Sequence, residues 1–328
     1  MDDQELEWVF GQIFDAEDLC EVGAYEDAIA LCDEVLETCG ECDDEDVHEA
    51  IAHALLCRGR SFAALERFED ELWCYSELLK RFESDGPAII DPLVAEAQFN
   101  AAVVTGQMGY TEESIGKYAA FIDRYKWHEE PQVQDQVIRA QFNWAVTLAH
   151  SDRRKEALSQ LNKLVVRYGD SSEPQYDITV IRALISKAGL ELCMGQTKTA
   201  IASATLGVEK CEASYSAERF HCHLVLATAY LISQEIESGE KHVASLLDLL
   251  PEIEDFPPAA NFHFSLRDMA MIIGRDRILE LIQRSPSAAI LAPLVDTLKQ
   301  KVRNDSERLK GIKDMAEDLE TDFASFGG

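Results

Sequence analysis

A repeat of 43 residues is the feature that most constrains the fold of this chain. The segment "AQFNAA" at residues 97–102 returns as "AQFNWA" at residues 140–145, 43 positions later. The same step relates five aliphatic residues, Ile29, Leu72, Ile115, Leu158 and Ile201. A repeat of this length predicts a stack of supersecondary units, because one unit cannot bury its apolar face without a neighbour.

Each unit has the pattern of two helices. In the third unit Val94, Ala97 and Ala101 recur at helical spacing, Gly109 interrupts the pattern, and a second apolar stripe runs over residues 115–125. Only 9 prolines and 17 glycines occur in 328 residues, which favours long helices and few linkers. We therefore expect an all-α, right-handed α-solenoid of about six helical hairpins over residues 1–253. Residues 254–328, which begin with "EDFPP", are expected to form a helical C-terminal cap.

The turns inside the hairpins carry a second pattern. "GAYEDAI" (23–29), "GYTEESI" (109–115) and "GQTKTAI" (195–201) place a glycine five residues before a small residue. A small residue also recurs in the first helices, at Gly59, Ala102, Ala145 and Ala188. In these features the chain resembles the tetratricopeptide repeat (TPR) family over roughly residues 5–250, although the family unit is about 34 residues long. The second unit departs from the family pattern, because Glu71 occupies a small-residue position.

The resemblance implies a function and a site. TPR proteins are non-catalytic scaffolds that hold a protein or peptide segment in a concave groove lined by the first helices. The groove positions carried over to this chain are Phe99, Asn100, Val103, Gln107, Arg139, Phe142, Asn143, Val146, His150 and Arg182, with Glu96, Ile185 and Ser186 at equivalent phases. Asparagine can pair with a peptide backbone, arginine can bind a carboxylate with two hydrogen bonds, and exposed phenylalanines would form an apolar binding patch. The alternative is that the longer unit rotates these helices and buries the same residues between hairpins.

The negative charge is concentrated at one end of the chain. The net charge is -31, and residues 1–50 contain 19 Asp and Glu but no Lys or Arg. Such a segment repels nucleic acids and anionic membranes, so neither is an expected partner, and it attracts basic proteins. An alternative function is therefore an acidic regulator that masks a basic protein surface through residues 1–50. The simpler interpretation is a solvated, solubilising face.

Cys39 and Cys42, followed by His48 and His53, have the residue types of a zinc site. The two pairs are closer in sequence than those of zinc fingers, and the equivalent loops of later units contain no such ligands. We expect an ordinary inter-unit loop without a metal or other cofactor. A thiol- or metal-responsive switch at Cys39 and Cys42 is the remaining alternative.

Catalysis and export are not expected. No Gly-rich phosphate loop, HExxH or GxSxG motif occurs, and the two histidines of "HCH" (221–223) lie on opposite sides of a helix. The opening "MDDQELEWVF" is acidic where a secretory signal is basic, and no apolar run approaches the roughly 18 residues that span a membrane. The sequence predicts a cytoplasmic protein with reduced thiols.

Overall fold

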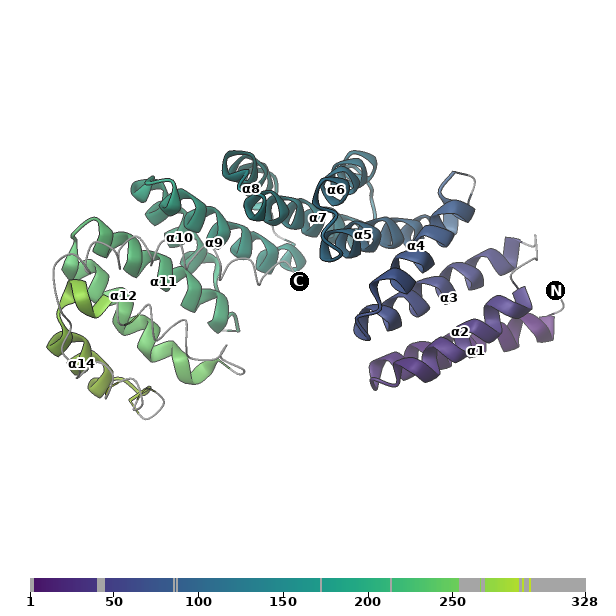
Figure 1. Ribbon diagram of the computed structural model, residues 1–328, viewed down its shortest axis with the longest axis horizontal. Coiled ribbons are helices and arrows are strands. Elements are labelled where there is room, and N and C mark those ends of the chain that lie inside the picture. Colours follow the sequence, from purple (N-terminus) through teal and green to yellow (C-terminus); the bar gives the residue numbers. More distant parts are fainter. Residues whose placement is uncertain are drawn as a thin grey trace. The chain divides into compact units, whose positions relative to one another are not determined.

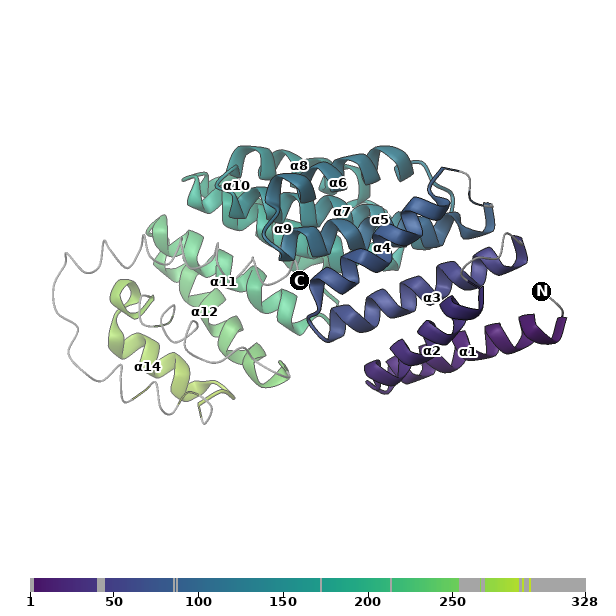
Figure 2. The same ribbon diagram turned by 45° about the vertical axis from the view of Figure 1, so that its right-hand side comes forward.

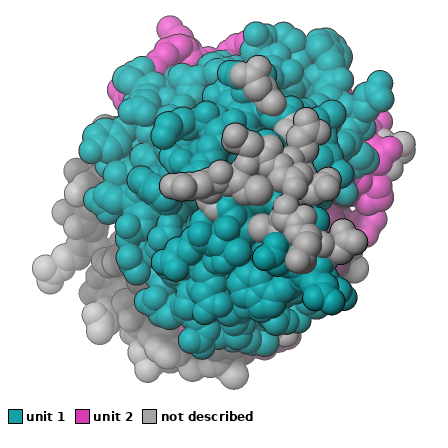
Figure 3. Space-filling model, turned by 90° about the vertical axis from the view of Figure 1, so that its right-hand side faces the viewer, with its two compact units in different colours: residues 1–147 teal, residues 148–328 magenta. Residues whose placement is uncertain are grey.

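A computed structural model describes residues 3–39, 45–84, 86, 88–171, 173–212, 214–253, 266, 269–288, 291 and 295. All the regular secondary structure in these residues is helical (Figure 1). The chain divides into two compact units, residues 1–147 and 148–328 (Figure 3).

Unit 1 is a stack of antiparallel helices. Its helices are α1 (Asp3–Glu21), α2 (Tyr25–Cys39), α3 (Glu45–Ala64), α4 (Phe68–Phe82), α5 (Asp91–Gln107), α6 (Thr111–Tyr125) and most of α7 (Pro131–His150), with a short 3-10 turn, η1 (Ala88–Ile90), before α5. Each helix from α1 to α5 contacts the next, and α3 also contacts α1 and α5 (Figures 1 and 2). The first helices of successive hairpins therefore form one layer.

Unit 2 repeats this arrangement. Its helices are α8 (Arg154–Tyr168), α9 (Asp177–Cys193), α10 (Thr197–Lys210), α11 (Ser216–Ile232), α12 (Ile236–Leu249) and α14 (Arg275–Arg284), with 3-10 turns η2 (Pro174–Tyr176) and η3 (Leu250–Glu252). α9 contacts α8, α10 and α11, and α12 contacts α11 and α14. α14 lies in the predicted C-terminal cap, and Arg277 pairs it with Glu240 of α12 at 3.0 Å. The predicted boundary at residue 254 and the rest of the predicted cap beyond residue 295 fall outside the described residues.

Every hairpin turn has the same backbone. One residue per turn has a positive φ: Gly23 (80°), Glu66 (56°), Gly109 (84°), Asp152 (58°), Gly195 (74°) and Gln234 (63°). The next residue donates its N–H to the carbonyl five residues earlier, as Tyr110 does to Thr105 at 3.1 Å. This is the Schellman ending of a helix, for which glycine has no steric penalty. Glu66, Asp152 and Gln234 hold this conformation at turns whose sequences lack the glycine.

The small residues of the first helices allow close packing. A Cβ added to Gly59 would lie 2.5 Å from the ring of Tyr75, which is 1% exposed. In the next hairpin, the Ser114 hydroxyl donates to the carbonyl of Ala102 at 2.8 Å. The two helices of a hairpin thus approach through small side chains, and the predicted all-α solenoid of helical hairpins is confirmed.

Candidate functional site

The repeat places equivalent residues on one face of the first helices of unit 1. Phe10, His53, Glu96 and Arg139 share one repeat position, and Phe14, Cys57, Asn100 and Asn143 share another, each 43 residues apart. We call the face of α1, α3, α5 and α7 that carries these residues the first-helix face. It contains most of the residues predicted to bind a partner.

An ion-pair ladder crosses this face from α1 to α5. Glu17 on α1 lies 3.7 Å from His53 and 3.4 Å from Arg60, both on α3. The other terminal nitrogen of Arg60 lies 3.8 Å from Glu96 on α5. These side chains remain partly exposed, so each pair is worth about 0–1 kcal/mol. Negative and positive charges therefore alternate along the face.

The two phenylalanines predicted in the groove are core residues. Phe99 and Phe142 are each 3% exposed, and the Phe99 ring packs on Phe121 of α6 at 6.0 Å between centroids. The expected exposed apolar patch at these positions is therefore wrong. The Phe99 ring faces α6, the second helix of its own hairpin, and belongs to an apolar cluster that also contains Val133 and Val137 of α7. Arg139 covers the same ring, with its guanidinium carbon 5.0 Å from the Phe99 centroid.

The asparagines lie at the edge of this core. Asn143 is half-buried and hydrogen-bonds the hydroxyl of Tyr118 on α6. Burial raises the pKa of Tyr118 to about 12, and the hydrogen bond with Asn143 acts in the opposite direction. Asn143 therefore has an intramolecular role that accounts for a polar residue at this phase. Asn100 is also half-buried.

The remaining predicted groove residues of unit 1 differ in exposure. Val103 and Val146 are half-buried, whereas Gln107 is exposed. The Arg139 side chain is 54% exposed and lies 3.8 Å from Asp135, one turn earlier on α7. Gln107 and Arg139 are thus the most accessible polar members of the predicted set in unit 1.

In unit 2 the predicted residues are fewer. His150 is exposed, and Arg182 on α9 binds the buried carboxylate of Glu218 on α11 at 3.1 Å. Ile185 is fully buried and Ser186 is 5% exposed. Arg182 links two first helices of unit 2, in the same way as Arg60 does in unit 1.

Sequence reasoning missed an exposed aromatic flank on α1. Phe14 is 64% exposed and Phe10 is 38% exposed, one helical turn apart. Glu7 lies three residues from Phe10 and Glu17 three residues from Phe14, while Glu21 lies four residues beyond Glu17, so all three share the same side of the helix. We call Glu7, Phe10, Phe14, Glu17 and Glu21 the α1 flank. The 43-residue repeat could have identified this flank, because it aligns Phe10 and Phe14 with first-helix positions of the later hairpins.

The register explains why the α1 flank is exposed. The residue equivalent to Phe14 is fully buried in α3 (Cys57), and in α7 it contacts the second helix of the preceding hairpin (Asn143 to Tyr118). Within the described residues no helix precedes α1. Phe14 therefore occupies a position that a preceding helix covers in the later units.

One buried carboxylate stands out in unit 1. Glu71 on α4 is 4% exposed, hydrogen-bonds Tyr75, and has one oxygen without a hydrogen-bond partner in the described part of the chain. Burial raises the pKa of Glu71 to about 7. It occupies the small-residue position that Ser114 fills in the next hairpin. Glu71 lies inside the hairpin, away from any surface that a partner could reach.

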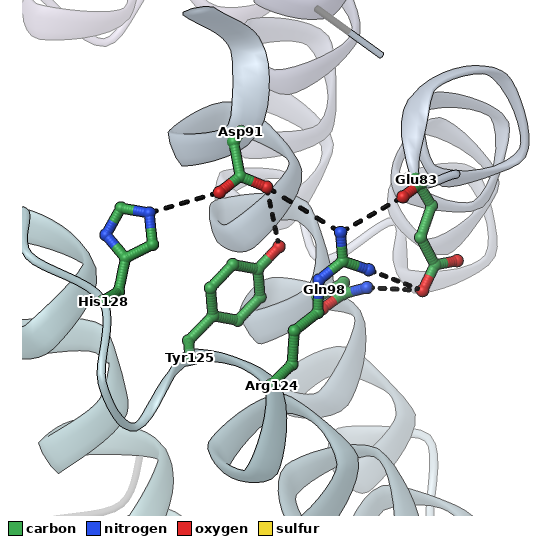
Figure 4. A network of polar contacts seen from close by, with 6 residues as sticks. All are labelled: Glu83, Asp91, Gln98, Arg124, Tyr125 and His128. Carbon is green, nitrogen blue, oxygen red and sulfur yellow. Dashed lines mark hydrogen bonds and ion pairs between the residues drawn. The ribbon is translucent and has the colours of Figure 1, made fainter. Parts of the chain in front are cut away.

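A polar network fixes the connection between α6 and α7 (Figure 4). Asp91, the first residue of α5, accepts from His128 at 3.2 Å and from the Tyr125 hydroxyl at 3.5 Å. Arg124 and Gln98 both donate to the Glu83 carboxylate, at 3.3 and 2.6 Å. Side chains therefore attach the connections on either side of the α5–α6 hairpin to that hairpin.

The predicted ligands of the first inter-hairpin loop have other contacts. Cys39 is fully buried, the His48 ring lies 5.3 Å from that of Phe82, and His53 faces Glu17. Cys42 lies outside the described residues. No group of three or more His, Cys, Asp or Glu within the described ranges could hold a metal ion. The switch at Cys39 and Cys42 stays a prediction.

The sequence matches no protein-family profile and no curated protein. Among solved structures, a tetratricopeptide repeat protein from Parabacteroides merdae aligns with a TM-score of 0.50 and 13% identity, over 81% of this chain and 98% of that one. The hairpins are TPR-like. A structure of Naa15/Naa10 bound to HypK-THB aligns over 97% of this chain and 55% of that one, at a TM-score of 0.38 and 12% identity. At these identities the TPR likeness concerns the fold. None of the described helices is both long enough and apolar enough to cross a membrane.

Proposed function

We propose that this TPR-like protein is a non-catalytic protein-interaction scaffold whose α1 flank binds a basic, amphipathic helix of a partner protein. The observation that carries the proposal is the 64% exposure of Phe14 at a repeat position that is buried or covered in the following hairpins. An apolar helix docked there would continue the stack, in the place that a preceding second helix occupies in later units.

Charge defines the chemistry of the partner. The α1 flank contains three glutamates, and the first 50 residues contain no Lys or Arg. A docked helix with Lys or Arg on either side of an apolar stripe would place its aliphatic residues on Phe10 and Phe14 and its cations beside Glu7 and Glu21. The acidic end would also steer such a partner over the Debye length of about 8–10 Å.

The exposed arginine of α7 supports a second binding surface for the same function. Arg139 is 54% exposed and is positioned over the Phe99 ring, with Gln107 exposed on α5. A partner carboxylate would bind this guanidinium with two hydrogen bonds. The predicted groove thus remains part of this proposal as a polar surface, and the buried Phe99 and Phe142 are excluded from it.

The free thiols fit the cytoplasm. Cys20, Cys32, Cys57, Cys74, Cys211 and Cys222 are thiols in the described part of the chain. Reduced thiols are typical of proteins that work in the cytosol. We propose that compartment for this scaffold.

Peptide binding tests the proposal on the full chain. The probe is a designed helix of Leu and Lys with one apolar stripe, compared with a scrambled peptide of the same composition and with a Leu/Glu version. We expect binding of the first peptide alone, with an affinity that falls as salt rises. Phe10→Ala with Phe14→Ala should weaken it at least tenfold, about 1.4 kcal/mol, as for a lost apolar hot spot.

The controls separate docking from general attraction. Trp127→Ala removes an aromatic side chain that is 77% exposed and lies outside the acidic segment, so it should leave the affinity unchanged. Arg139→Gln should also leave the affinity for the basic peptide unchanged, because Arg139 lies on α7, outside the α1 flank. Equal binding of the striped and scrambled basic peptides, or an unchanged affinity of the double phenylalanine variant, would contradict docking at the α1 flank.

A further inference from the structure

Three cysteines that are far apart in sequence meet inside the first two hairpins. The sulfur of Cys20 on α1 lies 3.6 Å from that of Cys57 on α3, and Cys32 on α2 hydrogen-bonds Cys57 as well. Cys57 is fully buried and Cys32 is 1% exposed, whereas Cys20 is half-buried. Cys20 is therefore the member of this cluster that solutes can reach.

The polar neighbours orient the two sulfurs. Ser61 donates its hydroxyl to the carbonyl of Cys57 at 2.9 Å, and its oxygen lies 3.1 Å from the Cys20 sulfur. Ser61 thus holds Cys20 beside Cys57: its bond to the Cys57 carbonyl lies within α3, and its contact with Cys20 crosses from α3 to α1.

The surroundings make the two thiols unequal. The hydrogen bond from Cys32 is the largest cause that lowers the pKa of Cys57, to about 7, and the Cys20 hydrogen bond and Arg60 act in the same direction. Burial raises the pKa of Cys20. At neutral pH Cys57 is the thiolate-rich partner, and Cys20 is the accessible one.

We propose that Cys20 and Cys57 are an oxidation site that closes to an intramolecular disulfide when a hydroperoxide reaches Cys20. In the first step the Cys57 thiolate takes the proton of Cys20, and the Cys20 sulfur attacks the peroxide. The O–O bond breaks, Cys20 becomes a sulfenic acid, and the leaving oxygen takes the proton back from Cys57 and departs as water or an alcohol. In the second step the Cys57 thiolate attacks the Cys20 sulfur, the S–O bond breaks, and a second water leaves with one proton from the medium. Two thiols lose two electrons to the peroxide, and the sum is two RSH plus ROOH giving RSSR, ROH and water.

The geometry allows this reaction with little movement. The sulfurs must approach from 3.6 Å to the bond length of about 2.05 Å. Within the described residues α1 packs mainly against α2 and α3, so it can shift with little disturbance of later hairpins. The bond would tether α1, and with it the α1 flank, to α3.

Peptide mapping of the oxidised full-length protein tests the proposal without any variant. The reduced protein is treated with hydrogen peroxide, and the remaining thiols are blocked with N-ethylmaleimide after denaturation. A protease that cuts after glutamate is required, because the first Lys or Arg is Arg58 and trypsin would leave the cluster in one peptide. We expect peptide 18–21 joined to peptide 50–66, two hydrogens lighter than their sum, and separated again by a thiol reductant.

Matched variants then identify the pair. Cys20→Ser should abolish the linked peptide, and Cys193→Ser, which removes a half-buried thiol of α9 in unit 2, should leave its yield unchanged. Cys57 joined to Cys32, a disulfide between two chains, or Cys20 oxidised to the sulfinic acid without a link would overturn the proposal. Oxidation of Cys20 no faster than that of Cys193 would overturn it too. The readout is covalent mass, so it does not depend on whether the α1 flank binds a partner.

Discussion

Replacing Glu71 with glutamine should stabilise unit 1, and more so at high pH. Glu71→Gln keeps the shape of the side chain and removes its charge. The folded protein holds the pKa of this carboxyl at about 7, against 4.5 for an exposed glutamate, because burial disfavours the anion. A raised carboxyl pKa costs no stability below pH 4.5, and the cost grows as pH rises toward 7.

The magnitude follows from linkage. The cost of ionising Glu71 in the folded protein grows between pH 4.5 and pH 7, the pKa values of the unfolded and the folded state. It is about 1 kcal/mol at pH 5 and reaches about 3 kcal/mol at pH 8. The glutamine variant should therefore gain about 3 kcal/mol in free energy of unfolding at pH 8 and about 1 kcal/mol at pH 5. The amide can still accept from Tyr75, so the hydrogen bond is retained.

Tryptophan fluorescence reports unit 1 selectively. All four tryptophans (Trp8, Trp73, Trp127 and Trp144) fall within residues 1–147. Urea unfolding followed by this signal at pH 5 and pH 8 gives both free energies. Glu69→Gln, an exposed carboxylate on the same helix, is the control and should change stability within about 0.5 kcal/mol at both pH values. A gain of equal size at both pH values, or a loss at pH 8, would refute an ionisation cost at Glu71.

Three further substitutions test the packing by the same assay. Gly59→Ala should destabilise unit 1 by about 1–3 kcal/mol, because its Cβ would meet the packed Tyr75 ring at 2.5 Å. Gly116→Ala, on an open face of α6 where a Cβ meets nothing within 4 Å, should instead stabilise by up to about 1 kcal/mol. Phe142→Ala should cost about 3–5 kcal/mol, since the ring is 3% exposed; a loss below about 1 kcal/mol would show that this ring is a surface residue after all.

The sequence predicted the hairpins well because each depends on local signals. The break at Gly109 and the stripe over residues 115–125 correspond to α5 and α6, which end and begin around that glycine. The turns at Glu66 and Asp152 lack glycine and still adopt the same conformation, because the repeat register and helix packing impose it. For these helices and turns, the repeat period and the position of a residue within the repeat were sufficient for the prediction.

The site was less predictable because burial depends on the angle between neighbouring helices. The family alignment placed Phe99 in a groove, but in units of 43 residues it packs against Phe121. The repeat period alone could not distinguish a groove position from a position that faces the second helix of the same hairpin. The sequence also could not predict the cluster of Cys20 and Cys57. The two residues are 37 positions apart and come together only because α1 and α3 are adjacent in the fold.

The ion-pair ladder gives unit 1 a mechanical property. Glu17, Arg60 and Glu96 each belong to a different hairpin, so every pair in the ladder bridges two hairpins and none lies within one. In a stack held together only by neighbours, such pairs act at the hinges between rigid elements. Ions in solution weaken them without reaching the apolar core. We therefore expect unit 1 to bend more easily along this face as ionic strength rises, while the structure within each hairpin is unchanged.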